Sequence, residues 1–439
     1  MESSPAGRLH HVRSSWRSSG EHALGREAVS RHPACGRGCA GWATRTRTVA
    51  MSIIVGAGGA LLIATILWDA FETVVLPRRV TRRLGPARLL VRGLWALWRG
   101  VARRVQDSAR RETYLSIFGP LSLILLLAFW AGCLILGFAM LQWALGSQFD
   151  APEPKPGFGT DLYVSGTTFF TLGLGDVAPR SGPARVLTVI EAGIGFGFLA
   201  LVLAYLPVLF QEFSRREVHI SMLDEWAGTP PSAAELLSRL ARYGSLADLG
   251  PYLAGWKVWA AELMEIHLSY PILAYFRSQH DAQSWIAALT TILDVCALAI
   301  VGIDGVPRRP AYLTFAMARH AIGDLSHMLA APPRPPARDR LPPEDLARLR
   351  AVLTAAGVIL RAGPAADEQL AALRRLYEPY VNALALHLLM PLPPWLPDPA
   401  ARDNWLRTAW ERADTLPAWL KGAPKDAAQW RRAAAGGTL

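Results

Sequence analysis

The chain has little charge and few cysteines for its 439 residues. Charged residues make up 18% of it and hydrophobic residues 51%, which excludes a disordered polar chain. The four cysteines are scattered and do not resemble a disulfide framework. They are Cys35, Cys39, Cys133 and Cys296. The sequence offers Cys35 and Cys39 no second CxxxC and no histidine pair, so neither redox nor metal chemistry is indicated.

Several other features are also missing. There is no internal repeat and no Gly-x-Gly-x-x-Gly after a strand pattern, so a nucleotide-binding domain is unsupported. Residues 1–50 are rich in Ser, Arg, Gly and His and lack an apolar stretch of signal-peptide length. We expect this segment to be disordered, or to be a mis-assigned extension of a chain that starts at Met51.

The formal charge is +11, and the arginines cluster beside apolar runs and not around a nucleic-acid motif. This favours anionic lipid headgroups over nucleic acid as the partner. Residues 51–76 are long and apolar enough for a peripheral transmembrane helix. Asp69 and Glu72 lie one helical turn apart near its end, and acids in a membrane are functional candidates. Arginines follow at the headgroup level and can pair with them, which favours a structural role.

The basic segment 77–112 mixes Leu, Val and Trp with arginines. Its pattern predicts a helix in the membrane interface, with the Trp side chains in the headgroup layer. A voltage sensor would need an arginine at every third position of a span, and this segment does not keep that spacing. Because the segment is so rich in arginine, it is predicted to be cytoplasmic.

Residues 113–214 contain two more apolar runs, from about Tyr114 to Leu145 and from about Arg185 to Phe213. The Pro-rich stretch Ser147–Asp161, with more acids than bases, is predicted to be external. Residues Thr160–Thr171 are too short to cross a bilayer. Non-helical backbone at membrane depth survives only where protein buries it or where it lines water, so a re-entrant half-helix and loop are expected.

The loop reads "TTFFTLGLGDVAP" from Thr167 to Pro179. In a cation filter, a row of backbone carbonyls replaces the hydration shell of the ion. Carbonyls can share one side only if ordinary and left-handed dihedrals alternate, and glycine adopts the latter without penalty. Gly173 and Gly175 occupy such alternate positions, and Thr171 can add a hydroxyl oxygen below them.

Between its two spans, this stretch resembles the pore-loop signature of potassium channels, Thr-x-Gly-Tyr-Gly-Asp. The resemblance implies a passive, potassium-selective or potassium-preferring channel in the cell membrane, with permeant K+ and no cofactor, and not an enzyme. One pore loop per chain implies a homotetramer. The resemblance also implies a pore helix that includes Thr167 and Thr168, and a filter with its external cap at Thr171, Leu172, Gly173, Leu174, Gly175 and Asp176.

The sequence departs from this family at two positions. Leu174 replaces the Tyr whose hydroxyl braces the filter, so a weakly selective cation channel is an alternative. Glu191 is an acid in the pore-lining helix. It either faces the conduction path or bonds behind the pore helix, and the second is favoured because Gly193 and Gly195 suggest close packing beside it. By resemblance, one of these two glycines lies near the gating hinge.

The remaining chain is predicted to be cytoplasmic and helical, with a domain at 215–331, a Pro-rich linker at 332–345 and a helical region at 346–439 that includes a segment from about Ala400 to Arg432. The run 284–303 fits a fourth span, but Asp294 at its centre favours a buried helix. A gating or interaction role is expected, and any ligand is left open. The alternative is a membrane-anchored sensor or enzyme with a degenerate pore. The predicted fold class is an all-α membrane protein with three transmembrane helices, a re-entrant pore helix and filter, and a cytoplasmic helical domain.

Overall fold

The computed structural model describes residues 38–76, 85–151, 157–279 and 282–397. The predicted all-α class is confirmed, because within these ranges the strands are limited to one short antiparallel pair, β1 (Phe149–Asp150) and β2 (Ala178–Pro179). Of the extension predicted at 1–50, residues 1–37 lie outside the described ranges. So does the segment predicted from Ala400 to Arg432.

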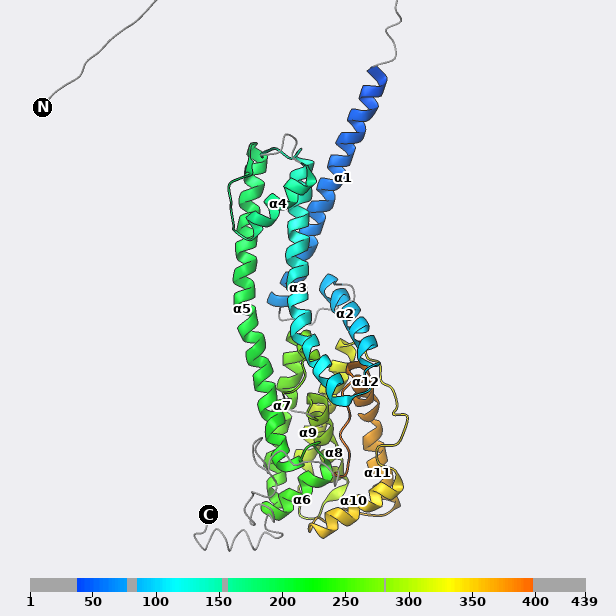
Figure 1. Cartoon of the computed structure of the whole chain (residues 1–439). Coiled ribbons are helices and arrows are strands. Elements are labelled where there is room, and N and C mark those ends of the chain that lie inside the picture. Colours follow the sequence, from blue (N-terminus) through cyan, green and yellow to red (C-terminus); the bar gives the residue numbers. More distant parts are fainter. Residues whose placement is uncertain (1–37, 77–84, 152–156, 280–281, 398–439) are drawn as a thin grey trace, which may run out of the picture. The chain divides into compact units, whose positions relative to one another are not determined.

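Three long apolar helices form the membrane module, α1 (Gly38–Ala70), α3 (Ser108–Ala144) and α5 (Gly182–Ala227) (Figure 1). A π-helical turn, η1 (Phe71–Val75), continues α1. The start of α1 corrects the expectation of disorder up to residue 50. From Trp42 to Val55 there is neither Gly nor Pro, so nothing in the sequence interrupts the helix upstream of the apolar run.

Small residues let α1 and α3 approach closely. A Cβ on Gly59 would lie 2.7 Å from the carbonyl oxygen of Gly137, and a Cβ on Gly137 would lie 2.6 Å from Ile63. Both distances are too short for a larger side chain. The pair therefore fixes the peripheral helix against α3, as small residues do in membrane helix packing.

Helix α2 (Pro86–Ala102) corrects the expectation that its tryptophans lie among lipid headgroups. Trp95 is 4% exposed, and its Nε1 donates to the carbonyl of His387 at 3.0 Å. Trp98 stacks on Tyr114 with ring centroids 4.3 Å apart. The indoles cover the helical domain and α3 because an amphipathic helix can pack its apolar face on protein as well as on lipid. Leu97, on the other face, is exposed.

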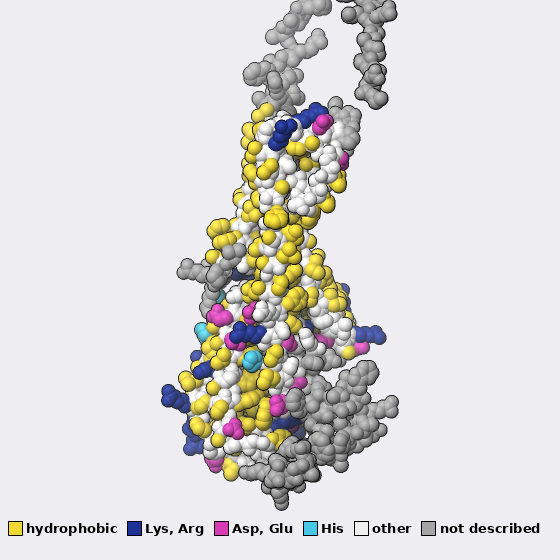
Figure 2. All heavy atoms as spheres, turned by 90° about the vertical axis from the view of Figure 1, so that its left-hand side faces the viewer, with side chains coloured by type: hydrophobic (Ala, Val, Ile, Leu, Met, Phe, Trp, Pro, Cys, Tyr) yellow, Lys and Arg dark blue, Asp and Glu magenta, His cyan; other side chains and the backbone are white. Residues whose placement is uncertain are grey.

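Helix α5 runs beyond the predicted end of its span and enters the helical domain without a break. The domain contains two 3₁₀ turns, η2 (Leu246–Asp248) and η3 (Pro271–Tyr275). Its helices are α6 (Ala233–Tyr243), α7 (Leu249–Ser269), α8 (Trp285–Gly302), α9 (Arg308–Met328), α10 (Pro343–Ala355), α11 (Pro364–Arg375) and α12 (Glu378–Leu388). Figure 2 shows the side of the protein on which α5 lies. There, hydrophobic side chains cover the membrane module, and charged side chains gather at the end of the module remote from the helical domain and over the domain itself.

In the described ranges, four helices are long and apolar enough to span a membrane, and α8 is one of them, yet every residue of α8 is buried by protein. At its centre, Asp294 accepts a hydrogen bond of 2.8 Å from Arg340 and another from Tyr377. Arg340 belongs to the Pro-rich segment 332–345, of which residues 332–342 form neither helix nor strand and the last three begin α10. A buried acid with these partners identifies α8 as the core helix of the domain.

Candidate functional site

A short helix, α4 (Phe158–Phe169), lies between α3 and α5 at the end of the membrane module remote from the helical domain (Figure 1). At about 1.5 Å per residue, its 12 residues span about 18 Å, which is too short to cross a bilayer. Near its start, the buried Asp161 accepts a hydrogen bond of 2.7 Å from Ser147 after α3. The helix therefore enters the module and stops inside it.

The chain leaves α4 in a loop whose backbone alternates in handedness. Thr171, Gly173 and Gly175 have φ values of 57°, 54° and 78°, so every second residue is left-handed. Gly173 and Gly175 adopt this conformation freely. For the β-branched Thr171 it is an outlier, and such strain is held by the surrounding structure and clusters at functional sites. This alternation turns successive carbonyls toward one side of the loop.

The end of α4 secures the beginning of the loop. The N–H of Thr171 donates to the carbonyl of Thr168 at 2.9 Å, and the N–H of Leu172 donates to the carbonyl of Thr167 at 2.8 Å. The backbone of the predicted threonine pair therefore holds the first two loop residues. The loop residues themselves are exposed in the single chain, and the side chain of Leu174 is 64% exposed.

A tyrosine braces the loop from another position. The Tyr163 hydroxyl on α4 donates to the Asp176 carboxylate at 2.8 Å. Leu174 carries no hydroxyl, whereas this bond from Tyr163 ties Asp176, at the end of the loop, to α4. Sequence reasoning missed it, because the two residues are thirteen positions apart and only the turn of the loop brings them together.

Glu191 takes the second of the two orientations considered from the sequence. Its side chain is fully buried and accepts a hydrogen bond from the Ser165 hydroxyl on α4. That hydroxyl also lies 2.7 Å from the Ile135 carbonyl oxygen on α3. Ser165 therefore forms a junction between α3, α4 and α5 behind the loop. Sequence reasoning did not single out Ser165, because a serine in a short apolar helix carries no signal of its partner.

The two predicted glycines of α5 differ in their surroundings. A Cβ on Gly195 would lie 2.0 Å from the carbonyl oxygen of Phe169, so this position admits only glycine while α4 ends where it does. A Cβ on Gly193 would meet no described atom within 4 Å. Gly195 thus serves the close packing of α5 on α4, and Gly193 is the glycine of the pair with free space around it.

A buried amide also joins α3 to α5. Gln142, with no exposed surface, donates from Nε2 to the Ala184 carbonyl at 3.3 Å and to the Thr188 hydroxyl at 3.2 Å. A glutamine inside an apolar run was the available signal for this contact. Together with Glu191, it gives the outer half of α5 two polar anchors.

The two acids near the end of α1 lie away from the loop, toward the helical domain. Asp69 is buried and accepts hydrogen bonds of 2.9 Å from the Trp130 indole and 3.0 Å from the Ala87 backbone N–H. The second of these bonds satisfies a free N–H in the first turn of α2. Glu72 accepts a hydrogen bond of 2.8 Å from the Trp68 indole.

Comparison with known proteins finds a family match within the membrane module. Residues 124–212, which contain most of α3, α4, the loop and α5 as far as Glu212, match the ion channel family. The chain is 24% identical over 256 residues to the uncharacterized membrane protein YdjJ of Bacillus subtilis (strain 168). The aligned region covers 58% of this chain and 73% of that protein. It is 34% identical over 83 residues to protein LctB of Geobacillus stearothermophilus, covering 17% of this chain and 61% of that protein. No solved structure matches the chain.

Proposed function

Because residues 124–212 match the ion channel family, we propose that this protein is a potassium-selective channel with the loop 171–175 as its selectivity filter. Ions shed water against the carbonyls of this loop and cross passively, and permeant K+ is the only ion required. Asp176 stands at the outer mouth, and its charge attracts cations there.

The alternating backbone of the loop is the observation that carries the proposal. Left-handed φ values at Thr171, Gly173 and Gly175 direct carbonyl oxygens toward one axis, as coordination of a dehydrated cation requires. An ordinary turn between two transmembrane helices needs neither this alternation nor a short helix buried in front of it. The threonine pair and the Tyr163–Asp176 bond hold the loop at its two ends.

We propose that the channel is a homotetramer. A ring of carbonyls needs several copies of the loop, and each chain supplies one. Large apolar side chains on the loop and on the adjoining face of α5 are exposed in the single chain, and copies related by fourfold symmetry would cover them. They include Phe170, Leu172, Leu174, Phe196, Leu199 and Leu203.

We propose that the protein lies in the cell membrane with its helical domain in the cytoplasm. The arginine-bearing helix α2 packs against the domain through Trp95 and the His387 carbonyl, so its arginines lie on the domain's side, as the positive-inside rule expects of cytoplasmic segments. Leu97 on α2 and Arg103, which follows this helix, are both exposed, and such side chains suit contact with anionic lipid headgroups. Since α5 continues into the domain, movement of the domain can reach the pore-lining helix directly.

Ion flux tests this function. The full chain is reconstituted in liposomes, and potassium and sodium flux are compared for wild type, Gly173→Ala and Gly132→Ala. Gly173→Ala should reduce potassium flux at least about tenfold, because φ of 54° is unfavourable for alanine and displaces a carbonyl. A Cβ on Gly132 of α3 would meet no described atom within 4 Å, so Gly132→Ala is the matched control. Absence of flux in wild type would favour a membrane-anchored sensor or enzyme instead.

Because Leu174 replaces the usual tyrosine, a weakly selective cation channel is the specific alternative to a potassium-selective one. Its side chain offers no hydrogen bond that would hold the width of the filter. If Tyr163 and Asp176 supply the brace, the wild type prefers potassium and Tyr163→Phe loses part of that preference. Sodium flux equal to potassium flux in wild type would identify an unselective cation channel.

A further inference from the structure

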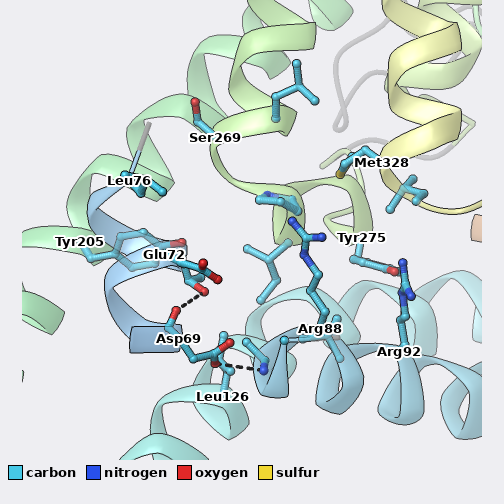
Figure 3. A pocket seen from close by; sticks show the side chains of 18 residues that line it. Asp69, Glu72, Leu76, Arg88, Arg92, Leu126, Tyr205, Ser269, Tyr275 and Met328 are labelled. Carbon is cyan, nitrogen blue, oxygen red and sulfur yellow. Dashed lines mark hydrogen bonds between the residues drawn. The ribbon is translucent and has the colours of Figure 1, made fainter. Parts of the chain in front are cut away.

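A pocket of about 130 Å³ lies beside the pore-lining helix, where α1 ends and α2 begins (Figure 3). Tyr205 of α5 forms one wall of it. Ser269 at the end of α7 and Tyr275 of η3 belong to the helical domain and form another. A molecule in this pocket therefore touches the pore-lining helix and the helical domain at the same time.

The depth of the pocket follows from three helices. At about 1.5 Å per residue, it lies about 26 Å along α1 from Ser52 to Asp69, and about 27 Å along α3 from Ala144 to Leu126. Along α5 it lies about 35 Å from Gly182 to Tyr205. The hydrocarbon core of a bilayer is about 30 Å thick. The pocket therefore lies at the headgroup level of the leaflet next to the helical domain.

Charges of both signs face each other across the pocket. Asp69 and Glu72 come from α1 and η1, and Arg88 and Arg92 come from α2. Figure 3 shows the Arg88 side chain rising from α2 into the space between Glu72 and the domain. Among the described residues of the lining, these two acids and two bases balance each other in number. Such a lining suits a ligand that carries one positive and one negative group.

The acidic wall suits an ammonium group. Asp69 already accepts from Trp130 and Ala87, which leaves Glu72 as the more available carboxylate. A second hollow of about 410 Å³ adjoins the same acids and is also lined by the half-exposed Trp68. A carboxylate beside an indole ring attracts a cation through both charge and the ring face.

The remaining walls suit phosphate and hydrocarbon. Guanidinium groups bind phosphate oxygens with paired hydrogen bonds, and Arg88 and Arg92 stand one helical turn apart on α2. Leu76, Leu126 and Ile272 line the same pocket and provide apolar surface for the start of an acyl chain.

We propose that this pocket binds one phospholipid whose headgroup carries a primary ammonium and a phosphate. Glu72 receives the ammonium, Arg88 and Arg92 receive the phosphate, and the acyl chains leave along the apolar wall into the bilayer. The bound lipid fastens α5 at Tyr205 to the domain at Ser269. Its effect on the open state rests on the proposed channel function, whereas binding itself does not.

Lipid binding is measured by native mass spectrometry on the full protein purified in detergent. The protein is titrated with phosphatidylethanolamine, phosphatidylglycerol or phosphatidylcholine. Phosphatidylethanolamine should bind at least about tenfold more tightly than the other two, because only its headgroup offers both an N–H donor for Glu72 and a phosphate for the arginines. Glu72→Gln and Arg92→Gln should each weaken its binding about tenfold.

Two further variants make the result specific. Ser269→Trp fills the pocket and should abolish lipid binding, whereas Arg103→Gln, at the residue that follows α2 and outside the pocket, should leave binding unchanged. Equal binding of phosphatidylglycerol overturns the proposal, and so does unchanged binding in Glu72→Gln or Ser269→Trp. The order in which wild type binds the three lipids tests the lipid proposal even if a variant misfolds. Because this measurement needs no ion flux, the lipid proposal is also tested if the protein proves not to be a channel.

Discussion

The Ser165 hydroxyl on α4 lies 2.7 Å from the Ile135 carbonyl oxygen on α3 and also contacts the Glu191 carboxyl group on α5. One side chain of the short helix thus joins it to both long helices around it. Ser165 and Glu191 are both fully buried, whereas the residues of the loop 171–176 are exposed in the single chain. The position of the loop therefore depends on groups that the ion never touches.

Replacing Glu191 tests this junction. Glu191→Leu removes the acceptor and should lower the free energy of unfolding by about 1–2 kcal/mol and reduce potassium preference, because α4 loses its link to α5. Glu191→Gln keeps a hydrogen-bonding group of similar size and should stay near wild type. Thermal unfolding and the potassium-to-sodium flux ratio give the two readouts. Equal behaviour of both variants would show that the bond has no role.

Gly195 offers a second test of how α5 positions α4. The Cβ of Gly195→Ala would lie 2.0 Å from the Phe169 carbonyl oxygen, so the end of α4 must shift. Since Phe169 directly precedes the loop, flux should fall strongly. Gly132→Ala on α3 has space for its Cβ and should conduct as wild type does. Full flux in Gly195→Ala would contradict the packing described for this helix pair.

The sequence predicted the membrane module well because its signals are local. Apolar runs of bilayer length predict spans, and a short run ending in Gly-Leu-Gly predicts a re-entrant segment. Helix ends were less predictable. The apolar run of α5 stops near Phe213, but no Gly or Pro intervenes between Pro207 and Gly228, so the helix continues in polar sequence.

Contacts between distant residues could not be predicted. The amphipathic pattern of α2 is the same whether lipid or protein covers its apolar face, and Trp95 and Trp98 proved to cover protein. The arginines expected to pair with Asp69 lie within residues 77–84, outside the described ranges. Among the described residues, Asp69 accepts from the Trp130 indole and the Ala87 backbone N–H, and predicting these bonds requires knowing how α1, α2 and α3 pack.

Acid should destabilise the helical domain through His267. Burial, together with the neighbouring Arg216 guanidinium, lowers the pKa of this histidine from 6.5 to about 3. The unfolded state takes up the proton below pH 6.5 while the folded state does not, so stability falls as the pH drops from 6.5 toward 3. At pH 5 the loss from this residue is about 2 kcal/mol.

Chemical unfolding at pH 7 and pH 5, followed by tryptophan fluorescence, measures the effect. His267→Gln cannot take up this proton, so its stability should change less between the two pH values than that of wild type, whatever its stability at pH 7. An identical change in both proteins would contradict the assignment.

Breaking the buried ion pair between Arg340 and Asp294 should strongly destabilise the helical domain. Arg340→Met leaves the Asp294 carboxylate without its cation inside the core, and the expected cost is about 3–5 kcal/mol. Arg348 makes a comparable contact with Asp345 but is 69% exposed, so Arg348→Met should cost less than about 1 kcal/mol. Denaturant unfolding compares the two variants, and equal costs would contradict the role given to Arg340.

The reversal potential of the purified protein in a planar bilayer, with potassium on one side and sodium on the other, tests the central claim most directly. A filter built from the carbonyls of residues 171–175 predicts a current that reverses at least about 59 mV away from zero, on the side that opposes potassium flow, which corresponds to potassium favoured at least about tenfold. A current that reverses at zero would contradict potassium selectivity. The absence of any current would contradict the channel itself.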